Sequence, residues 1–306
     1  MSEHTGLIIL GNAGKIFFLR YAPRLPKPGE TLIGTKFATS YGGKGANQCV
    51  AAAKLGGNTY MICKLGDDQW GKNYKEHLKE VGVDVGHIQI QPNMCTGIAQ
   101  ICVADDGENQ IVIVPGANNY LNEADVDTYS DLIMQAEVII AQLETPFIPT
   151  LKAFKLSKGL KILNAAPARA DIEEILPHCT ILCVNEPEAS LLTGLEVNLE
   201  CKLLAFGCEI VIITLGANGA VYATRKDQEL VHVMCENVTA IDTTGAGDAF
   251  VGALATFLIS YKNYPIHQVI GAACYVASIS VTKEGTQTSF PTDVKVFDKE
   301  YKYVTL

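Results

Sequence analysis

The sequence lacks several features that would place it in a common class of proteins. No apolar run reaches the length of a membrane span, and the longest candidate, residues 250–259, predicts an ordinary core helix. Residues 1–6 are polar, with no basic start and no apolar core, so we expect no secretory leader. Basic residues are outnumbered by acidic ones, 24 to 33, and the net charge of −9 argues against a nucleic-acid or anionic-membrane partner. Any phosphate site must therefore be built locally.

Closely spaced cysteine pairs and histidine clusters are missing as well. The ten cysteines are scattered without a CxxC spacing, and most lie inside apolar runs, for example Cys49, Cys63 and Cys183. This pattern predicts buried, reduced thiols in a cytoplasmic protein, with nuclear access left open, rather than disulfides or a metal cluster. The six histidines are isolated from one another. Zinc-hydrolase and Ser-His-Asp mechanisms therefore have no support.

What the sequence does contain is a regular alternation of strand-like and helix-like segments. Of its 306 residues 48% are hydrophobic, which is enough for one large α/β domain or two smaller ones. The alternation predicts a mostly parallel sheet with helices on both faces, whose ligands bind beyond the carboxyl ends of the strands. The expected helices are 45–55, 69–81, 123–135, 148–157, 186–192 and 249–260. The expected strands are 7–10, 58–63, 137–142, 160–163, 180–184 and 209–214.

Two segments, about 12–40 and 95–115, do not fit this alternation. The first contains strand-like runs at 16–19 and 31–37 separated by prolines, and the second contains a strand pair around a polar turn. We expect them to form a small β lid attached to a single domain that spans residues 1–306. The alternative is that they are edge strands of the main sheet.

One stretch, residues 242–250, combines small residues with acids at the start of an apolar helix. Its sequence is Asp242-Thr243-Thr244-Gly245-Ala246-Gly247-Asp248-Ala249-Phe250. Backbone N–H groups from Gly245 to Gly247 are the unpaired donors of a first helical turn, which suits a phosphate. Asp248 beside a phosphate is explained if it acts as a general base for an attacking hydroxyl. The alternative is a tight strand-to-helix turn with an acid in the first turn.

Two nucleotide motifs with similar spelling are excluded. The 242–250 stretch is no GxGxxG fingerprint, because Phe250 occupies its third glycine position. Residues 66–72 spell GxxxxGK, but Asn73 follows where Ser or Thr is needed, and Asp67 and Asp68 would stand where phosphate binds.

Other candidate residues also follow predicted strands or open helices. Gly43, Lys44 and Asn47 bring backbone access and hydroxyl-binding donors to a helix start, or they form only a flexible loop. Glu144 can accept from a hydroxyl, or it is a solvated loop acid. Asn185 and Glu188 share one face of a helix start and suit Mg²⁺ through its waters, although a capping box explains the same spacing. Residues 214–219 form a turn, either beside a nucleotide or within a hairpin.

Taken together these motifs resemble the ribokinase branch of the PfkB carbohydrate kinase family. The stretch Gly42-Gly43-Lys44-Gly45-Ala46-Asn47-Gln48 and the 242–250 stretch match its paired signatures. The resemblance continues through most of the chain, at 66–68, 142–144, 164–168, 185–188, 214–216 and 285–289. It implies a three-layer ribokinase-like fold with a mostly parallel central sheet and a β lid, which often pairs with the lid of a second subunit. The implied reaction is ATP-dependent phosphorylation of D-ribose at its 5-hydroxyl.

The resemblance also implies roles for individual residues. Asp248 would be the base, with an anion hole at Gly245, Ala246 and Gly247. The residues implied to hold the sugar are Asn12, Gly43, Lys44, Asn47, Glu144 and Asp248. Those implied to contact ATP are Asn185, Thr214, Leu215, Gly216, Ala217, Asn218, Gly219, Gly247 and Cys274, although many relatives carry Asn or His at the last position. Those implied for metals are Asn185 and Glu188 for Mg²⁺, and Asp242, Thr244, Ser280, Lys283, Gly285 and Ser289 for K⁺.

The chain departs from this family at one position that matters for the sugar. Ribokinases carry an aspartate shortly after the first strand, but here no aspartate precedes Asp67. Each lost charge-assisted hydrogen bond to a sugar hydroxyl is worth about 1.5–3 kcal/mol. This leaves two alternatives open: another kinase of the family, acting on fructose, a keto-sugar acid or a nucleoside, and a catalytically impaired nucleotide-binding regulatory homologue.

Overall fold

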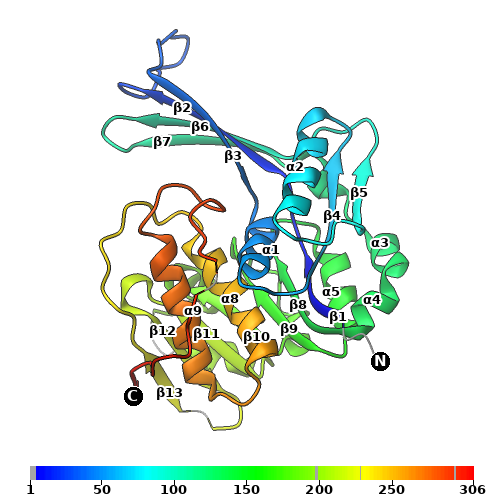
Figure 1. Cartoon of the computed structure of the whole chain (residues 1–306), viewed down its shortest axis with the longest axis vertical. Coiled ribbons are helices and arrows are strands. Elements are labelled where there is room, and N and C mark those ends of the chain that lie inside the picture. Colours follow the sequence, from blue (N-terminus) through cyan, green and yellow to red (C-terminus); the bar gives the residue numbers. More distant parts are fainter. Residues whose placement is uncertain (1–4, 197–198, 228, 293) are drawn as a thin grey trace.

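The computed structural model describes residues 5–196, 199–227, 229–292 and 294–306 (Figure 1). Residues 1–4, part of the segment for which no secretory leader is expected, lie outside these ranges. The described chain forms one large sheet with helices on both faces, and a small sheet that projects from it (Figure 1). None of the described helices is long and apolar enough to cross a membrane.

Within the described residues the large sheet has ten strands, in the order β14-β13-β12-β11-β10-β9-β8-β1-β4-β5. Seven of them are mutually parallel: β1 (Thr5–Leu10), β4 (Thr59–Gly66), β5 (Ile88–Gln91), β8 (Ala136–Gln142), β9 (Leu160–Asn164), β10 (Ile181–Asn185) and β11 (Ile210–Thr214). Three antiparallel strands extend one edge: β12 (Ala220–Thr224), β13 (Leu230–Val233) and β14 (Tyr303–Thr305). The predicted mostly parallel sheet is thus confirmed.

Both faces of this sheet are buried because side chains of a strand alternate between them. In β1, Leu7 and Ile9 enter one core, whereas Ile8 and Leu10 enter the other. The first core packs against α1 (Lys44–Lys54), α2 (Gln69–Glu80), α8 (Ala246–Ser260) and α9 (Ile266–Ser280). The second packs against α3 (Glu123–Thr128), α4 (Ser130–Gln135), α5 (Phe147–Leu156), α6 (Glu186–Thr193) and α7 (Leu199–Ala205). Short 3₁₀ turns occur at Gly116–Tyr120, Leu176–His178 and Gly216–Asn218.

The single helix predicted for 123–135 is wrong, because the structure breaks it at Tyr129 into α3 and α4. A capping box between Asn122 and Asp125 starts α3. Near its end the hydroxyl of Thr128 bonds back to the carbonyl of Ala124 at 2.8 Å, a contact that weakens a helix interior. Poor helix formers around the break then favour a stop over continuation.

The small sheet has four strands in the order β3-β2-β6-β7, with β2 (Lys15–Ala22), β3 (Lys36–Gly42), β6 (Ile98–Ala104) and β7 (Asn109–Val114). Two antiparallel hairpins, β2 with β3 and β6 with β7, join through a parallel β2–β6 pair. It is a separate sheet, so the alternative of extra edge strands on the main sheet is wrong.

The strand predicted at 31–37 begins only at Lys36, opposite Tyr21. Beyond that pair the facing chain carries Pro23, Pro26 and Pro28, which have no N–H groups to continue the ladder.

Candidate active site

Polar side chains gather along the carboxyl edge of the large sheet, where its parallel strands end. The strand order places β1, β8, β9, β10 and β11 side by side. The residues at or just after their ends are Asn12, Gln142, Glu144, Asn164, Asn185 and Thr214. The start of α8 and the N-terminal half of α1 lie at this same edge, since Gln48 of α1 bonds both to Asn164 at the end of β9 and to Asp248 in α8.

The start of α8 brings the predicted base and the predicted anion hole together. Gly245 is the N-cap, with φ of 82° in the left-handed region, and an added Cβ would meet Thr286 at 2.3 Å, so only glycine fits. Asp248 lies in the first turn and is 7% exposed. The N–H of Ala246 donates to the carbonyl of Thr243 at 3.2 Å. Of the three predicted donors, Gly245 and Gly247 therefore remain the better candidates for an anion.

Two side chains from α1 hold the carboxylate of Asp248. Nδ2 of Asn47 donates to its Oδ2 at 2.8 Å, and Nε2 of Gln48 donates to its Oδ1 at 2.9 Å. Burial raises the pKa of Asp248, while the charge of Lys44 and these two hydrogen bonds only partly offset that rise. The result is a carboxylate that is more basic than an ordinary aspartate and fixed in direction.

Gln48 extends this contact into a buried amide cluster whose role the sequence does not predict. Its Nε2 also donates to Oδ1 of Asn164 at 2.9 Å, and its Oε1 accepts from Nε2 of Gln142 at 2.6 Å. All three amides are at least 91% buried. The sequence signal for this cluster is Gln48 inside the apolar run of α1, together with the amides Gln142 and Asn164 at the ends of β8 and β9.

Asn12, Lys44 and Glu144 form a second cluster beside the start of α1. Nδ2 of Asn12 donates to Oε2 of Glu144 at 2.7 Å, and the same oxygen accepts from the N–H of Lys44 at 3.3 Å. Oδ1 of Asn12 accepts from the N–H of Gly45 at 3.0 Å. Gly43 precedes this helix as its N-cap, with φ of 102°. The predicted sugar-binding residues are therefore neighbours in space.

A cavity of about 200 Å³ connects several of these groups. Its lining includes Lys44, Gly245, Gly247, Asp248 and, from the next strand ends, the pair Asn185 and Glu188. The last two form the capping box that their spacing also predicts: each side chain accepts from the other residue's backbone N–H, at 2.8 and 2.9 Å. Burial raises the pKa of Glu188. Capping and access to the cavity coexist at this pair.

A second cavity of about 210 Å³ adjoins the first, since Thr214 and Gly247 line both. Its walls are largely apolar, with Ala277, Val281 and Cys274 from the α9 region. Gly216, Ala217 and Gly219 line it, whereas the two other residues of the 215–219 turn predicted to contact a nucleotide do not. Leu215 packs against a core, and the carbonyl of Asn218 lies 2.7 Å from Nε2 of His232.

Of the residues predicted to bind K⁺, Thr244 and Gly285 contact Asp242. Its Oδ1 accepts from the N–H of Thr244 and its Oδ2 from the N–H of Gly285, each at 2.9 Å. Burial raises its pKa, but these hydrogen bonds outweigh burial and lower it overall. The hydroxyls of Ser280 and Ser289 bond to backbone carbonyls within their own turns, and Lys283 is exposed. Among the described residues, no three His, Cys, Asp or Glu side chains form a metal cluster.

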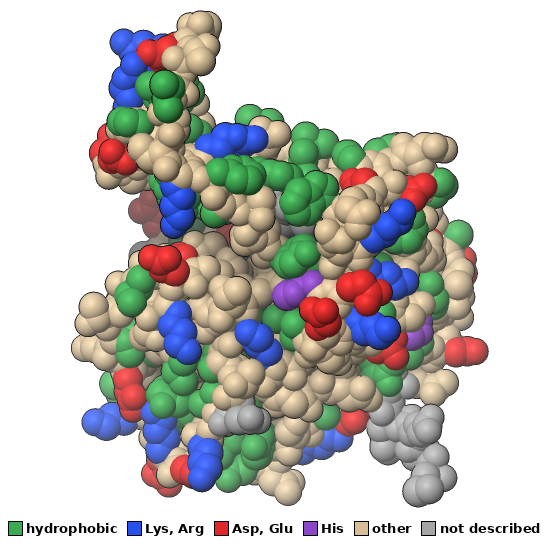
Figure 2. Space-filling model, turned by 45° about the horizontal axis from the view of Figure 1, so that its top comes forward, with side chains coloured by type: hydrophobic (Ala, Val, Ile, Leu, Met, Phe, Trp, Pro, Cys, Tyr) green, Lys and Arg blue, Asp and Glu red, His purple; other side chains and the backbone are tan. Residues whose placement is uncertain are grey.

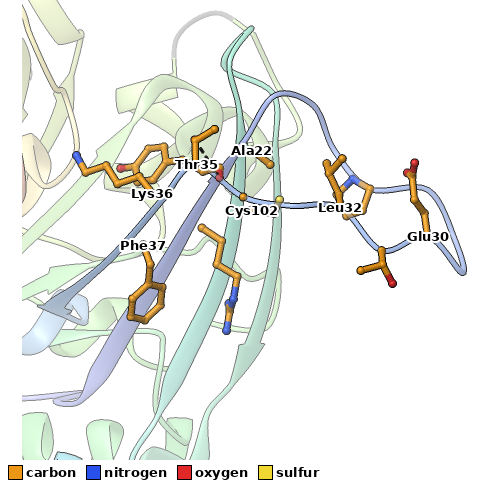
Figure 3. Close-up of a pocket in the computed structure, with 12 residues that line it drawn as sticks. Ala22, Glu30, Leu32, Thr35, Lys36, Phe37 and Cys102 are labelled. Atoms are coloured by element: carbon orange, nitrogen blue, oxygen red, sulfur yellow. Dashed lines mark hydrogen bonds between the residues drawn. The ribbon is translucent and has the colours of Figure 1, made fainter.

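A larger hollow of about 650 Å³ lies on the small sheet instead of at the strand ends (Figure 3). Phe37, Lys36 and Cys102 line it together with the loop that carries Glu30. Glu30, the one acid among its described lining residues, is exposed and paired with Arg24. Figure 2 shows that one end of the upper part of the molecule projects beyond the main body, with hydrophobic side chains on its surface. The hollow has no buried acid, so the smaller cavity at the strand ends is the better candidate for chemistry.

Comparison with known proteins gives consistent matches. The family described as pfkB family carbohydrate kinase matches residues 6–293. The chain is 42% identical to the ribokinase of Mus musculus, over 94% of this chain and 93% of that protein. It is 41% identical to the ribokinase of Haemophilus influenzae, over 88% and 90%. Its structure is similar to that of Arabidopsis thaliana ribokinase complexed with ribose and ATP, with a TM-score of 0.87 and 29% identity over 95% and 97% of the two chains.

Proposed function

The chain belongs to the pfkB family of carbohydrate kinases, and from this membership we propose that it transfers the terminal phosphoryl group of ATP to the 5-hydroxyl of D-ribose. The products are D-ribose 5-phosphate and ADP. The observation that carries the proposal is the buried carboxylate of Asp248, held by Asn47 and Gln48 at the start of α8 and bordering the cavity that Gly245 and Gly247 also line.

In the proposed reaction Asp248 accepts the proton of the sugar hydroxyl. The hydroxyl oxygen then forms a bond to the γ-phosphorus, and the bond from that phosphorus to the β–γ bridging oxygen breaks. N–H groups of Gly245 and Gly247 stabilise the charge on the transferring group. The raised pKa of Asp248 matches it to this task, because a stronger base takes the proton more readily.

The nucleotide is placed in the cavity that adjoins the reaction site. Ala277, Val281 and Cys274 offer the base an apolar surface, and Gly216, Ala217 and Gly219 allow a close approach of backbone. Thr214 and Gly247 line both cavities, so a nucleotide lying here directs its phosphates toward Asp248. Relatives of known structure are described as bound to ATP or ADP, which supports the same cofactor here.

Two metal ions complete the proposal. Asn185 and Glu188 border the reaction cavity with hard oxygen atoms, a donor set that fits a hydrated Mg²⁺. Bound there, Mg²⁺ neutralises charge on the phosphates. K⁺ is assigned to the loops joined by Asp242, with Thr244, Ser280, Lys283, Gly285 and Ser289. That assignment fits the two hydrogen bonds from Thr244 and Gly285 to Asp242, which hold the two loops together next to the start of α8.

Sugar choice rests on a set of residues without the aspartate usual after the first strand. Asn12, Ala13 and Gly14 follow β1, and Glu144 is the carboxylate bonded to Asn12. We assign sugar contacts to Asn12, Gly43, Lys44, Glu144 and Asp248, with Asn47 directing Asp248. Without this aspartate, we expect a lower affinity for ribose than in relatives that carry it.

The small sheet is assigned two roles, a lid over the sugar and a contact with the lid of a second copy. Its projection from the main body and the exposed apolar side chains of β7 support both roles. The ten cysteines lie within the described ranges and are all free thiols, which suits the reducing cytoplasm.

A substrate panel tests the proposed function. The purified protein is given ATP and Mg²⁺ with D-ribose, 2-deoxyribose, fructose, a keto-sugar acid or a nucleoside, with and without K⁺. ADP release is measured, and ³¹P NMR locates the phosphate on the product. We expect turnover with ribose, phosphate on the 5-oxygen, and a higher rate with K⁺. Turnover of only another acceptor would identify a different kinase of the family, and ATP binding without any turnover would identify a regulatory protein.

A further inference from the structure

Gln287 connects three parts of the molecule that the proposed reaction uses separately. It is 5% exposed and lies in the 285–289 loop, close to the start of α8. Its Nε2 donates to Oδ1 of Asn47 at 2.9 Å and to the hydroxyl oxygen of Tyr74 at 2.8 Å. Asn47 in turn donates to Asp248, and the hydroxyl of Tyr74 donates to the carbonyl of Gly42 at 2.8 Å. Gly42 is the last residue of β3 in the small sheet.

The carboxylate of Asp248 determines the donor and acceptor of each amide hydrogen bond in this series. An ionised Asp248 can only accept, so Asn47 must turn its Nδ2 toward Asp248 and its Oδ1 away. Oδ1 then requires a donor, which Gln287 provides through Nε2. The remaining oxygen of Gln287, Oε1, lies 2.8 Å from Nε2 of His77, which must carry a proton to donate to it. A reversal of any one amide would place like atoms in contact.

The backbone and the packing around Gln287 hold it in place. Nζ of Lys54, at the end of α1, donates to the carbonyl of Gln287 at 2.6 Å and to that of Phe290 at 3.2 Å. Tyr74 is fully buried, and the ring of Tyr41 from β3 stacks on it with centroids 4.6 Å apart. The series of hydrogen bonds from β3 to Asp248 therefore passes only through groups that are buried or held by further contacts.

We propose that Gln287 is a positioning residue for the base, which fixes the amide of Asn47 toward Asp248 and ties this pair through Tyr74 to the end of β3. Gln287 does not touch the reacting atoms. It acts by keeping Nδ2 of Asn47 directed at the carboxylate, and the link to Gly42 makes that orientation depend on where the small sheet lies. This role deepens the proposed kinase function and rests on it.

Gln287→Met tests the proposal because methionine is close to glutamine in size but makes none of the three hydrogen bonds of the Gln287 amide. We expect kcat with ribose to fall by about 10- to 100-fold, the effect of a slightly misplaced catalytic group. We also expect the acid limb of kcat/KM to move up by about one pH unit, because a hydrogen bond that favours the ionised form is weakened. The charged groups near Asp248 that stay in place are Lys44, Glu144 and Glu188.

Gln268→Met is the matched control. Gln268 is half-buried near the start of α9 and its amide makes two hydrogen bonds to the backbone of Tyr301, so its replacement also removes hydrogen bonds that hold the fold together. It is not part of the network around Asp248. The control is expected to lower the melting temperature without moving the acid limb. If both variants leave the acid limb where it is in the unmodified protein, Gln287 is only structural and the proposal is wrong.

Tyr74→Phe provides a second test that preserves packing if Gln287→Met fails to fold. It removes only the hydroxyl that joins Gln287 to Gly42. We expect a smaller fall in kcat, of about 3-fold, and an effect that is not additive with Gln287→Met, since both act through one network. Fully additive effects would contradict the proposal.

A readout that needs no turnover separates this proposal from the proposed function. ¹³C NMR of aspartate-labelled protein follows the titration of Asp248, and Asp248→Asn identifies its signal. A titration midpoint that rises in Gln287→Met but not in Gln268→Met supports the network even if ribose is not the substrate. An unchanged midpoint in a protein that phosphorylates ribose overturns the network and leaves the proposed function standing.

Discussion

Asp248 shows at the scale of one residue how burial and hydrogen bonding oppose each other. Removal from water favours the protonated acid, and the amides of Asn47 and Gln48 favour the ionised one. Burial is the larger effect, so the pKa lies above that of an ordinary aspartate. A base of this kind is stronger than a surface aspartate, but it is active only once it has lost its proton.

The sign of the pH dependence follows from this raised pKa. As pH falls through that pKa, Asp248 takes up a proton and can no longer act as a base, so kcat/KM declines on the acid side. We expect this acid limb at higher pH than the pKa of an ordinary, solvent-exposed aspartate would give, measured by initial rates with ribose across pH.

Replacement of Asp248 by asparagine should lower kcat by about 10²- to 10⁴-fold, the usual contribution of a general base.

Two outcomes would contradict that assignment. One is near-normal turnover of a folded Asp248→Asn variant, with folding checked by circular dichroism. The other is an acid limb that survives unchanged in the small residual activity of the variant, because another group would then be titrating.

Cys235 offers a residue-scale test of where the nucleotide binds. It is half-buried, its Sγ lies 2.7 Å from the hydroxyl of Ser278, and it lines the cavity assigned to ATP. We expect ATP to slow its alkylation by iodoacetamide about tenfold when ATP is at ten times its Kd, since only the free protein reacts. Peptide mass spectrometry reads the rate at each cysteine.

Cys201 serves as the internal control for this experiment. It is exposed on α7 and does not line the nucleotide cavity. Its alkylation should not respond to ATP. Equal alkylation rates at Cys235 with and without saturating ATP would show that the nucleotide does not bind in this cavity.

Sequence reasoning placed the chemically distinctive residues but not the amides that support them. Asp248 and the turn before it were identifiable because a carboxylate beside an anion-binding turn at a helix start is repelled by the anion unless it takes part in the chemistry. Gln48, Gln142 and Asn164 were not assigned roles, because an amide in an apolar run gives no sign of its partner. Those partners lie 94–200 residues away along the chain and only the fold brings them together.

At the scale of an element, the start of α8 depends on one glycine. Gly245→Ala would hold alanine at φ of 82° and drive its Cβ against Thr286. Left-handed strain costs about 1–2 kcal/mol and overpacking about 1–3 kcal/mol, so we expect the free energy of unfolding to fall by about 2–5 kcal/mol. Turnover should fall as well, because the N–H groups of this turn would shift. Urea denaturation and the ribose assay measure the two effects.

Gly82→Ala is the matched control for this substitution. Gly82 follows α2 with φ of 96°, but an added Cβ there would meet no described atom within 4 Å. It should cost only the left-handed strain, about 1–2 kcal/mol, with turnover unchanged. Equal losses of stability and activity in the two variants would show that the contact with Thr286 has no special importance.

The predicted elements agreed best with the structure where a hydrophobic run was bounded by glycine or a cap. The expected helix at 69–81 and the expected strand at 209–214 are found as α2 and β11, within a residue of their predicted bounds. The predicted bounds were wrong where other parts of the sequence ended a strand or a helix earlier than its own pattern suggests. The hairpin β2–β3 ends at a register determined by prolines on the facing chain, and α3 and α4 divide at a residue inside an amphipathic pattern.

At the scale of the whole molecule, the alternation of elements was enough to predict a parallel sheet, but not the antiparallel extension at its edge. β12, β13 and β14 are three to five residues long, and β14 is separated from β13 by more than sixty residues. Short strands joined across such distances leave no periodic pattern. The small sheet was predictable because its segments interrupt the alternation.

The projecting sheet leads to a prediction about assembly. All six residues of β7 are exposed in the single chain, including Val112 with 65% of its surface exposed. An apolar edge strand of this kind is a liability unless a partner covers it. We expect the protein to be a dimer through this sheet, and Val112→Glu to convert it into a monomer, as measured by light scattering coupled to size-exclusion chromatography.

Leu191→Glu separates a specific contact from a general effect of adding charge. Leu191 is 56% exposed on α6, on the main body, so it matches Val112 in exposure but lies outside the small sheet. The control should remain dimeric. If the unmodified protein is a monomer at micromolar concentration, the lid has no partner copy, and its apolar residues must then be explained by closure over the sugar. Loss of the dimer in both Val112→Glu and Leu191→Glu would contradict an interface through β7, because such an interface should be disrupted only by the substitution in β7.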